Sequence, residues 1–446
     1  MIMDYFKNKK GGDEKPILST STVFKTSGVP EYTFVERDAL SYEIEDYLES
    51  KNGILLFLGY SKSGKTVFRK KHIEGKGFEL VTYRGNNSST VNGLYNQIAS
   101  QLKLIQSKTL QQVQSSTYQV EQESQLGNKN FGHVRDKEVD TTSGSIDIAS
   151  DFSLSPIDVN FLCNKLAGLN VLIVIEDYHL VGNEFNKTLS EDLKHFLDED
   201  ILFLLIGIPS SPNRALRNNP DLSGRMRGVS FDYLSREEVK EIINVGGNCL
   251  NVEFREDVIE KIIQYSMKNA YLVQCICREL VDNKNIKKTA IEKVIISDAE
   301  DVKDACIKIA QRLDADYSSI YDTILSGARA QQLEKAFNQY EEILKAIKHF
   351  SIEELEKGVT HRDVSSKAWS NMPPEKIKKF VDNKTYKSET SFKNSITSQV
   401  KNAIDRINDN LSSKATRPIL FVNDSTLYLT DLIFKFYINW KIESNA

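Results

Sequence analysis

Continuous apolar runs alternate with amphipathic segments over the first half of the chain. Three such runs contain only apolar residues, at 54–58, 171–175 and 201–206, and a partly apolar run lies at 78–83. Continuous runs of this length are typical of strands that are buried on both faces of a sheet. Apolar residues three or four positions apart predict helices at 38–49, from about 65, at 91–102 and at 188–197. Strands that alternate with helices predict an α/β fold with a parallel sheet.

Beyond residue 231 the pattern becomes helical, and no further strand is expected before residue 419. Ser235 followed by Glu238 is the signature of a capping box, which opens a run of helices to about residue 325. A later helix carries apolar residues at helical spacing: Phe392, Ile396, Val400, Ile404 and Ile407. Short strands are expected at 419–422 and 426–430. Helices followed by such a hairpin predict a winged-helix domain.

These changes in pattern divide the chain into four parts. They are a flexible N-terminal tail at 1–30, a core at 31–234, a helical lid at 235–325 and a winged-helix domain at 326–446. The core contains a polar, Gln-rich insertion at about 107–150, whose few apolar residues favour disorder. Weak alternation within it leaves an ordered β-hairpin as the alternative. After the insertion, we expect Ser155 to cap a helix that has Pro156 and Asp158 near its start.

A glycine-rich loop follows the apolar run at 54–58. Its residues are Gly59, Tyr60, Ser61, Lys62, Ser63, Gly64, Lys65, Thr66 and Val67. Glycines let the backbone fold tightly, so that successive N–H groups point at a phosphate chain. Between a strand and a helix, this loop is expected to place Lys65 at the β- and γ-phosphates and Thr66 at Mg²⁺. The loop therefore predicts a phosphate-binding loop (P-loop) for ATP and Mg²⁺.

Two carboxylates, Glu176 and Asp177, follow the apolar run at 171–175. A nucleoside-triphosphate site needs acidic residues at a nearby strand end to hold Mg²⁺ and to orient the attacking water. We expect Glu176 to hold the metal and Asp177 to polarise the water. Arg225, or its neighbour Arg227, is a candidate for the cation that acts at the nucleotide of a neighbouring subunit. Solvated arginines at a helix end fit the same pattern.

Composition limits the choice of partners. The 446 residues carry a net charge of −4, so the molecule as a whole favours neither nucleic acid nor a membrane surface. The segment 361–418 differs, with twelve Lys and Arg against six Asp and Glu. The five cysteines are scattered, which favours a reduced, cytoplasmic compartment. No run approaches the roughly 18 apolar residues of a membrane span, and the N-terminus lacks the apolar core of a signal peptide.

The order of these features resembles that of the AAA+/STAND P-loop ATPases. The resemblance rests on the P-loop, the acidic strand, residues 204–209, the Ser-Gly-Arg at 223–225, the capped lid and the winged helix. It is closest to the branch that holds origin-recognition-like proteins and prokaryotic ATPases with C-terminal winged helices. Residues 33–37 resemble the family segment that lies beside the adenine, which places Arg37 at the nucleotide. Residues 432–440 resemble the closing segment of such winged helices.

The chain departs from the family pattern at three places. The family usually has Asp then Glu where this chain has Glu176 then Asp177, and the shorter Asp side chain predicts slow hydrolysis. Only Ser210 stands where a polar sensor residue is expected after the strand at 201–206. The sequence Lys-Asn-Ala at 268–270 replaces the Gly-x-Pro that is common in the lid, so the family gives no template for how this lid contacts the nucleotide.

The resemblance implies an ATP-binding and ATP-hydrolysing switch that assembles into homo-oligomers. Because about 30 residues precede the core, we expect the output to come from the winged helix or from a separate effector protein. ATPases of this build often serve in bacterial defence or regulation, which is an analogy at the level of the fold. Two alternatives stay open. One is a DNA-binding ATPase that uses 361–418, and the other is a nucleotide-binding structural subunit with little turnover.

Overall fold

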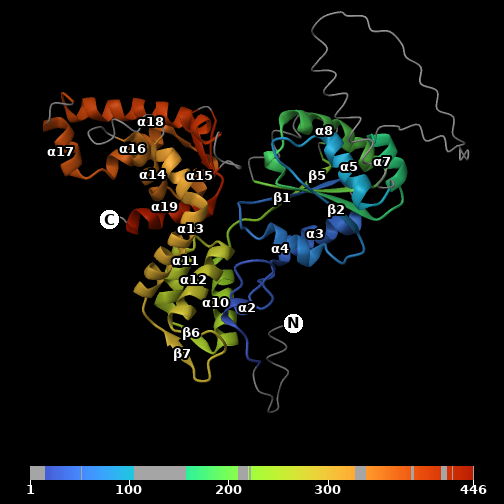
Figure 1. Ribbon diagram of the computed structural model, residues 1–446, viewed down its shortest axis with the longest axis horizontal. Helices are drawn as coiled ribbons and strands as arrows, with labels where there is room; N and C mark the ends of the chain where they lie inside the picture. Colours follow the sequence, from blue (N-terminus) through green and yellow to red (C-terminus); the bar gives the residue numbers. More distant parts are fainter. Residues whose placement is uncertain are drawn as a thin grey trace, which may run out of the picture. The chain divides into compact units, whose positions relative to one another are not determined.

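The computed structural model is drawn in Figure 1. It describes residues 16–51, 53–104, 157–208, 219, 222, 224–326, 338–382, 386–412, 419–423 and 425–444. The predicted insertion at 107–150, together with Ser155, Pro156, Ser210 and Ser223, lies outside this part of the chain. The chain forms two compact units, which we describe separately. The sheet unit comprises Ile44–Leu56 and Glu74–Gly228, and the lid unit comprises Met1–Glu43, Phe57–Ile73 and Val229–Ala446.

A five-stranded sheet is the framework of the α/β fold, in the strand order β2-β3-β4-β1-β5. Its strands are β1 (Ile54–Leu58), β2 (Glu79–Arg84), β3 (Val171–Glu176), β4 (Leu202–Gly207) and β5 (Met226–Ser230). β3 pairs in parallel with both β2 and β4, which confirms the fold class that the continuous apolar runs predicted. β5 was not predicted, because its sequence Met-Arg-Gly-Val-Ser has neither an apolar run nor a clear alternation.

Helices follow the strands close to the predicted positions. They are α3 (Asp38–Ser50), α4 (Lys65–His72), α5 (Val91–Gln101), α7 (Val159–Leu166) and α8 (Asn183–Asp198). The predicted cap of α7 is wrong, because the N-cap residue is Asp158, whose carboxylate accepts from the N–H of Phe161 at 2.8 Å. Ser, Pro and Asp are all favoured near a helix start, so the sequence pattern alone placed the helix start too early.

The region predicted as the lid, 235–325, contains α10 (Arg236–Leu250), α11 (Glu256–Tyr265), α12 (Ala270–Asn283) and α13 (Glu300–Ser326), which ends one residue beyond it. Ser235 and Glu238 form the predicted capping box at the start of α10. The expectation that this region has no strands is wrong, because β6 (Val252–Phe254) and β7 (Val294–Ile296) pair in parallel. Strands of three residues are too short for a period of two to stand out from the surrounding helical pattern.

Residues 16–24 pack on the lid and do not belong to a flexible tail, so that prediction is wrong for this stretch. The stretch includes α2 (Thr20–Val23), and the side chains of Val23 and Phe24 are fully buried. The Phe24 ring meets the Phe254 ring edge to face, with centroids 6.3 Å apart. Two adjacent apolar residues among polar ones show no periodicity, so their burial could not be predicted from the pattern.

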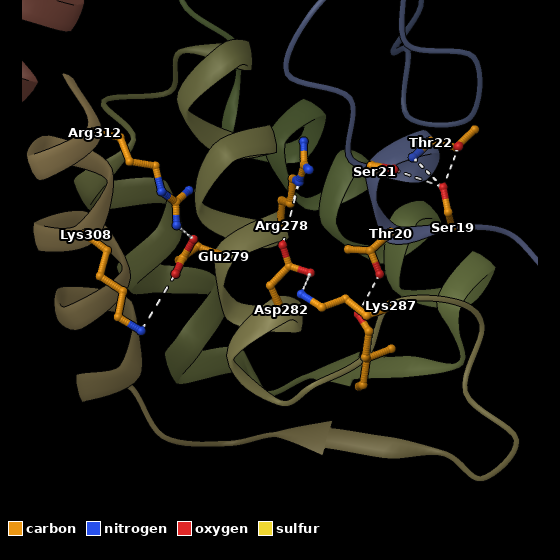
Figure 2. A network of polar contacts seen from close by, with 11 residues as sticks. Ser19, Thr20, Ser21, Thr22, Arg278, Glu279, Asp282, Lys287, Lys308 and Arg312 are labelled. Carbon is orange, nitrogen blue, oxygen red and sulfur yellow. Dashed lines mark hydrogen bonds and ion pairs between the residues drawn. The ribbon is translucent and has the colours of Figure 1, made fainter. Parts of the chain in front are cut away.

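Hydrogen bonds fasten the same stretch to the loop after α12 (Figure 2). The N–H of Thr20 donates to the carbonyl of Lys287 at 3.0 Å, and its hydroxyl donates to the carbonyl of Ile286 at 2.7 Å. The N–H of Leu18 donates to the hydroxyl of Thr289 at 2.9 Å. Buried polar groups that lose such partners are costly, so these bonds fix the position of residues 16–24 on the lid.

A buried carboxylate ties α12 to α13 (Figure 2). Glu279 of α12 is 4% exposed and pairs with Arg312 and, at 3.8 Å, with Lys308, both on α13. Asp282 of α12 pairs with Lys287 at 2.9 Å on the surface. The surface pair contributes little, whereas Glu279 without its partners would be a buried, uncompensated charge. We infer that α12 is held firmly against α13.

The C-terminal part combines helices with a small antiparallel sheet (Figure 1). Its helices are α14 (Gln339–His349), α15 (Ile352–Lys357), α16 (His361–Ser370), α17 (Pro374–Asp382), α18 (Glu389–Ser412) and α19 (Leu432–Ser444). Its strands are β8 (Val359–Thr360), β9 (Leu420–Asn423) and β10 (Thr426–Leu429), in the order β8-β10-β9. β9 and β10 form the predicted hairpin. The identification of a winged helix, and the division of the chain into four domains, stay predictions.

A buried lysine lies on α19. Lys435 is 4% exposed, and its ammonium donates to the carbonyls of Ile347 and Lys348 at 2.8 and 3.1 Å, at the C-terminal end of α14. Burial lowers the pKa of Lys435 to about 8, while the Glu354 carboxylate opposes this shift and Lys348 adds to it. The charged form of Lys435 is therefore costly in the folded protein.

Lys435 is expected to make its own contribution to the pH dependence of stability. Between the folded-state pKa of about 8 and the ordinary value of 10.5, the Lys435 side chain binds more protons in the unfolded chain than in the folded one. The contribution of Lys435 to the free energy of unfolding therefore rises with pH in this window, by up to about 3 kcal/mol. Lys435→Met should lack this rise. Urea unfolding of both proteins at a series of pH values measures the difference, and parallel curves would contradict the expectation.

Candidate functional site

The glycine-rich loop joins β1 to α4, and two of its glycines are required by geometry. Gly64 is the N-cap residue of α4 and has a φ of 98°, a conformation that side chains disfavour. A Cβ atom on Gly59 would lie 2.7 Å from the Ser63 hydroxyl and 2.9 Å from the carbonyl oxygen of Phe231. A larger residue at position 59 would therefore displace the loop. α4 begins at Lys65 as predicted, so its positive N-terminal end lies next to the loop.

The ammonium group of Lys65 lies within the loop. It donates to the carbonyls of Gly59 and Tyr60 at 2.5 and 2.6 Å, and it lies 3.4 Å from the Ser63 hydroxyl. Carbonyl oxygens are weaker partners for an ammonium than the charged oxygens of a phosphate. An anion bound by the loop would therefore compete with these carbonyls for Lys65.

A cavity of about 350 Å³ adjoins the loop, within the size range of ligand pockets. The loop residues in its wall are Lys62, Ser63, Gly64, Lys65, Thr66 and Val67. The N-terminal segment, which we define as residues 16–37, contributes 25–30, 33–35 and Arg37, and the lid contributes Ile242, Ala270, Tyr271 and Gln274. Of the loop residues assigned to the nucleotide, Gly59, Tyr60 and Ser61 do not belong to this wall. The cavity thus brings together three parts of the lid unit that are distant in sequence.

Arg37 lines the cavity, but its guanidinium is engaged with other groups. Its Nε donates to the Glu238 carboxylate at 3.2 Å, and its Nη1 donates to the carbonyl of Asp232 at 3.2 Å. Glu238 also closes the capping box with Ser235. Arg37 therefore fastens the N-terminal segment to the start of α10. A direct contact of Arg37 with a nucleotide stays a prediction.

Two lid residues reach the P-loop, and both lie at the start of α12. Asn269 is the N-cap residue of α12, and its amide donates to the carbonyl of Lys62 at 3.4 Å. The ring centroid of Tyr271 lies 5.2 Å from the Lys62 ammonium. Lys268, with a φ of 55°, belongs to the tight turn that precedes the helix. The place where the lid sequence departs from the family pattern is thus the place where the lid meets the loop.

A polar contact that the sequence did not predict joins the N-terminal segment to the lid. Thr33 and Gln274 are 2% and 4% exposed. The Gln274 amide donates to the Thr33 hydroxyl at 2.8 Å, and this hydroxyl donates to the carbonyl of Val23 at 2.8 Å. The two side chains are 241 positions apart, so no local pattern marks them as partners.

The predicted acidic pair lies in the sheet unit. Glu176 is the last residue of β3, and it pairs in register with Arg84 of β2. Asp177 follows with a φ of 52° and precedes the short 3₁₀ helix η1 (Tyr178–Leu180). The Asp177 carboxylate lies 3.3 Å from the Nε of Arg84. Glu176 therefore stands at the strand end and Asp177 one residue beyond it. The roles of metal ligand and water-polarising base stay predictions.

Arg225 also lies in the sheet unit, directly before β5. Its side chain is 40% exposed, and its guanidinium lies 3.1 Å from the Asp198 carboxylate at the end of α8. Arg227 pairs with Asp46 of α3. Both arginines thus have acidic partners in their own chain, and Arg225 would have to leave Asp198 to act on a neighbouring subunit.

Other candidate chemistry is sparse in the part of the chain that the structure describes. Across these residues, no group of three or more His, Cys, Asp and Glu side chains could hold a metal ion. All five cysteines are buried, and none of them forms a disulfide bond. Among the described helices, none combines the length and the apolar character that a membrane span requires.

No family model matches the chain, and no curated protein matches its sequence. Among solved structures, a Walker-type ATPase of Pyrococcus abyssi matches with a TM-score of 0.50 and 13% identity, over 93% of this chain and 99% of that one. Cdc6p of Pyrobaculum aerophilum matches with a TM-score of 0.40 and 12% identity, over 96% and 100% of the two chains. At 13% identity the first likeness shows the fold alone. The chain has the fold of a Walker-type P-loop ATPase, as the resemblance implied.

Proposed function

We propose that this chain is an ATP-binding and ATP-hydrolysing switch of the AAA+/STAND type. The observation that carries the proposal is the shared wall of the cavity, because the P-loop, the N-terminal segment and the lid all border the same space. A nucleotide in this cavity would contact all three, so its binding and loss would change how they pack. The complete spacing of the Gly-x-x-x-x-Gly-Lys-Thr motif after a strand favours ATP as the ligand.

In this proposal the side chains divide the chemistry between them. The loop N–H groups and Lys65 bind the β- and γ-phosphates. Thr66, which lines the cavity, and Glu176 would hold Mg²⁺, which neutralises charge on the phosphate oxygens when bound. Asp177 orients the attacking water. Because the Asp side chain is one carbon shorter than Glu, we expect turnover to be slow.

A chain of contacts from the loop to the C-terminal part supports a switch rather than a passive subunit. The Tyr60 ring is 5% exposed and stacks on Tyr233, with centroids 6.3 Å apart. The Tyr233 hydroxyl donates to the Glu356 carboxylate of α15 at 2.7 Å. Burial and then the Glu356 charge raise the pKa of Tyr60 far above its usual range, so the phenol stays protonated. We expect the output to follow this path to the winged helix or to a separate effector.

DNA binding through 361–418 has less support than the switch. On α18, Lys401 pairs with Asp405 at 3.5 Å, and Asp405 also accepts from the Ser425 hydroxyl at 2.7 Å. These contacts offset part of the positive charge that a phosphate backbone would need. The experiment below therefore also tests whether the chain is a DNA-binding ATPase.

The proposal is tested by titrating the protein with ADP and with the β,γ-imido analogue of ATP, in the presence of Mg²⁺, by calorimetry. We expect one site per chain, and slow phosphate release from ATP. A folded protein that binds neither nucleotide would overturn the proposal. Nucleotide binding without turnover would support the alternative of a nucleotide-binding structural subunit. ATP-dependent retention of duplex DNA would support the alternative of a DNA-binding ATPase.

Assembly provides a separate prediction. If Arg225 acts at the nucleotide of a neighbouring subunit, hydrolysis per chain should rise with protein concentration, and ATP should favour larger particles. A cation supplied in this way can raise phosphoryl-transfer rates by on the order of 10³-fold or more. Arg225→Ala should therefore lower turnover at least about tenfold while nucleotide affinity is unchanged. Phosphate release and light scattering measure the two effects.

A mixing experiment provides the control. Arg225→Ala and Lys65→Ala proteins should partly restore each other's activity, because some interfaces then combine an intact P-loop with an intact arginine. Arg227→Ala removes a nearby arginine that pairs with Asp46, and it should leave turnover unchanged. A strictly monomeric ATP-bound form, with the same activity per chain at every concentration, would show that Arg225 is only a surface residue.

A further inference from the structure

The lid contributes no charged side chain to the wall of the cavity among the residues that the structure describes there. Its contributions are Ile242, Ala270, Tyr271 and Gln274. A triphosphate carries several negative charges, and its transfer needs cations around the terminal phosphate. The P-loop has a second lysine besides Lys65, namely Lys62, which lines the same cavity. Lys62 is also a loop residue that the lid contacts.

The backbone of Lys62 is held by the start of α12. Lys62 has a φ of 63°, an uncommon conformation for a residue with a side chain. Its carbonyl accepts from the Asn269 amide at 3.4 Å. Asn269 is 3% exposed, and its Oδ1 also accepts from the N–H of Leu272 at 3.2 Å. One side chain therefore caps α12 and fixes the position of the loop residue.

The side chain of Lys62 is held by the same helix. Its ammonium lies 5.2 Å from the centroid of the Tyr271 ring, a distance at which a cation is attracted to an aromatic face. The Tyr271 ring lies in the wall of the cavity. It holds an exposed ammonium at the edge of the cavity.

We propose that Lys62 is a second phosphate-binding cation, which binds the terminal phosphate of a nucleoside triphosphate and is positioned by Asn269 and Tyr271 of the lid. This inference rests on the proposed function and adds a way to distinguish ATP from ADP. Only the triphosphate places a phosphate within reach of Lys62. Coupling between two groups is reciprocal, so the lid affects the preference for ATP and the terminal phosphate affects the lid.

The first experiment compares Lys62→Met with the wild type by calorimetry, using ADP and the β,γ-imido analogue of ATP. We expect the variant to bind the triphosphate about tenfold more weakly, because a charge-assisted contact is lost, and to bind ADP with an affinity within about twofold. Lys70→Met is the matched control, because Lys70 also lines the cavity but lies on α4. Lys70→Met should change the affinity for ADP and the affinity for the triphosphate by the same factor.

The second experiment tests the positioning role of the lid. Tyr271→Leu should weaken triphosphate binding by about two- to fivefold, which is the range of an exposed cation–aromatic contact, and should leave ADP binding unchanged. Tyr271→Phe keeps the ring and should retain the wild-type ratio of the two affinities. A purely structural role of Tyr271 would change both affinities together.

The outcomes separate this inference from the proposed function. If the wild type binds neither nucleotide, the proposed function fails. If the wild type binds both and Lys62→Met keeps the wild-type ratio of affinities, the proposed function stands and the role of Lys62 is refuted. An equal loss of triphosphate affinity in Lys62→Met and Lys70→Met would also refute the role of Lys62. Such a result would reflect only the general charge of the cavity.

Discussion

Lys65→Ala is expected to remove nucleotide binding at concentrations that saturate the wild type. The ammonium of Lys65 lies within 2.6 Å of two loop carbonyls, in a loop whose N–H groups and helix end favour an anion. Two charge-assisted contacts to phosphate, at about 1.5–3 kcal/mol each, would be lost. The dissociation constant should therefore rise by about 100-fold or more, as measured by calorimetry with the β,γ-imido analogue of ATP.

Folding of the variant is the control for this prediction. Without a nucleotide, Lys65 donates to the carbonyls of Gly59 and Tyr60 in its own loop, and we expect its removal to change the melting temperature by no more than a few degrees. Gly59→Ala gives a contrasting case, because its Cβ would collide with Phe231 and should disturb both the loop and nucleotide binding. Unchanged ATP affinity in folded Lys65→Ala would show that the loop is not the nucleotide site.

Asp177→Asn is expected to retain nucleotide binding and to lose turnover. An amide has the shape of the carboxylate but cannot accept the proton of the attacking water, and such a loss typically costs about 10²–10⁴-fold in rate. Glu176→Gln should instead weaken the dependence of binding on Mg²⁺. If Asp177→Asn removes Mg²⁺-dependent binding while Glu176→Gln preserves it, the two roles are exchanged and Asp177 is the metal ligand.

Arg84 provides a matched control for this second prediction. Its side chain lies 3.3 Å from the Asp177 carboxylate, and it is 77% exposed. An exposed ion pair adds little to stability, so Arg84→Gln should fold normally. It should leave the Asp177 carboxylate in place to orient water, so turnover should stay at least as high as in the wild type. A loss of turnover equal to that of Asp177→Asn would mean that the pair, and not the carboxylate alone, is required.

The parts of the fold that were predicted correctly are those with a local signal. β1, β3 and β4 are buried on both faces, so five or six consecutive apolar residues mark each of them in the sequence. β5 was missed because its sequence has neither an apolar run nor a clear alternation, and β6 and β7 were missed because each has only three residues. The docking of Phe24 on the lid was missed because its ring partner Phe254 lies 230 positions further along the chain.

The residues of the candidate site also fall into two groups, those with a local signal in the sequence and those without one. The P-loop could be predicted, because its glycines and Lys65 are needed at fixed spacing within eight residues. The other walls of the cavity come from the N-terminal segment and from α10 and α12. Their contacts, such as Arg37 with Glu238 and Thr33 with Gln274, span 201 and 241 positions. Such pairs leave no periodic pattern in either stretch, so only the folded chain reveals them.

The docking of residues 16–24 has a consequence for the order in which the protein is made. The N–H of Leu18 bonds to Thr289 across 271 positions, and ribosomes add about 5–20 residues per second. The N-terminal segment therefore exists for roughly 15–55 s before its partner is synthesised. Throughout that time the lid against which Val23 and Phe24 pack is incomplete, and both side chains are fully buried in the finished protein. The nascent chain thus exposes an apolar pair to chaperones and to premature contacts, and the wall of the cavity is completed only after the lid has been synthesised.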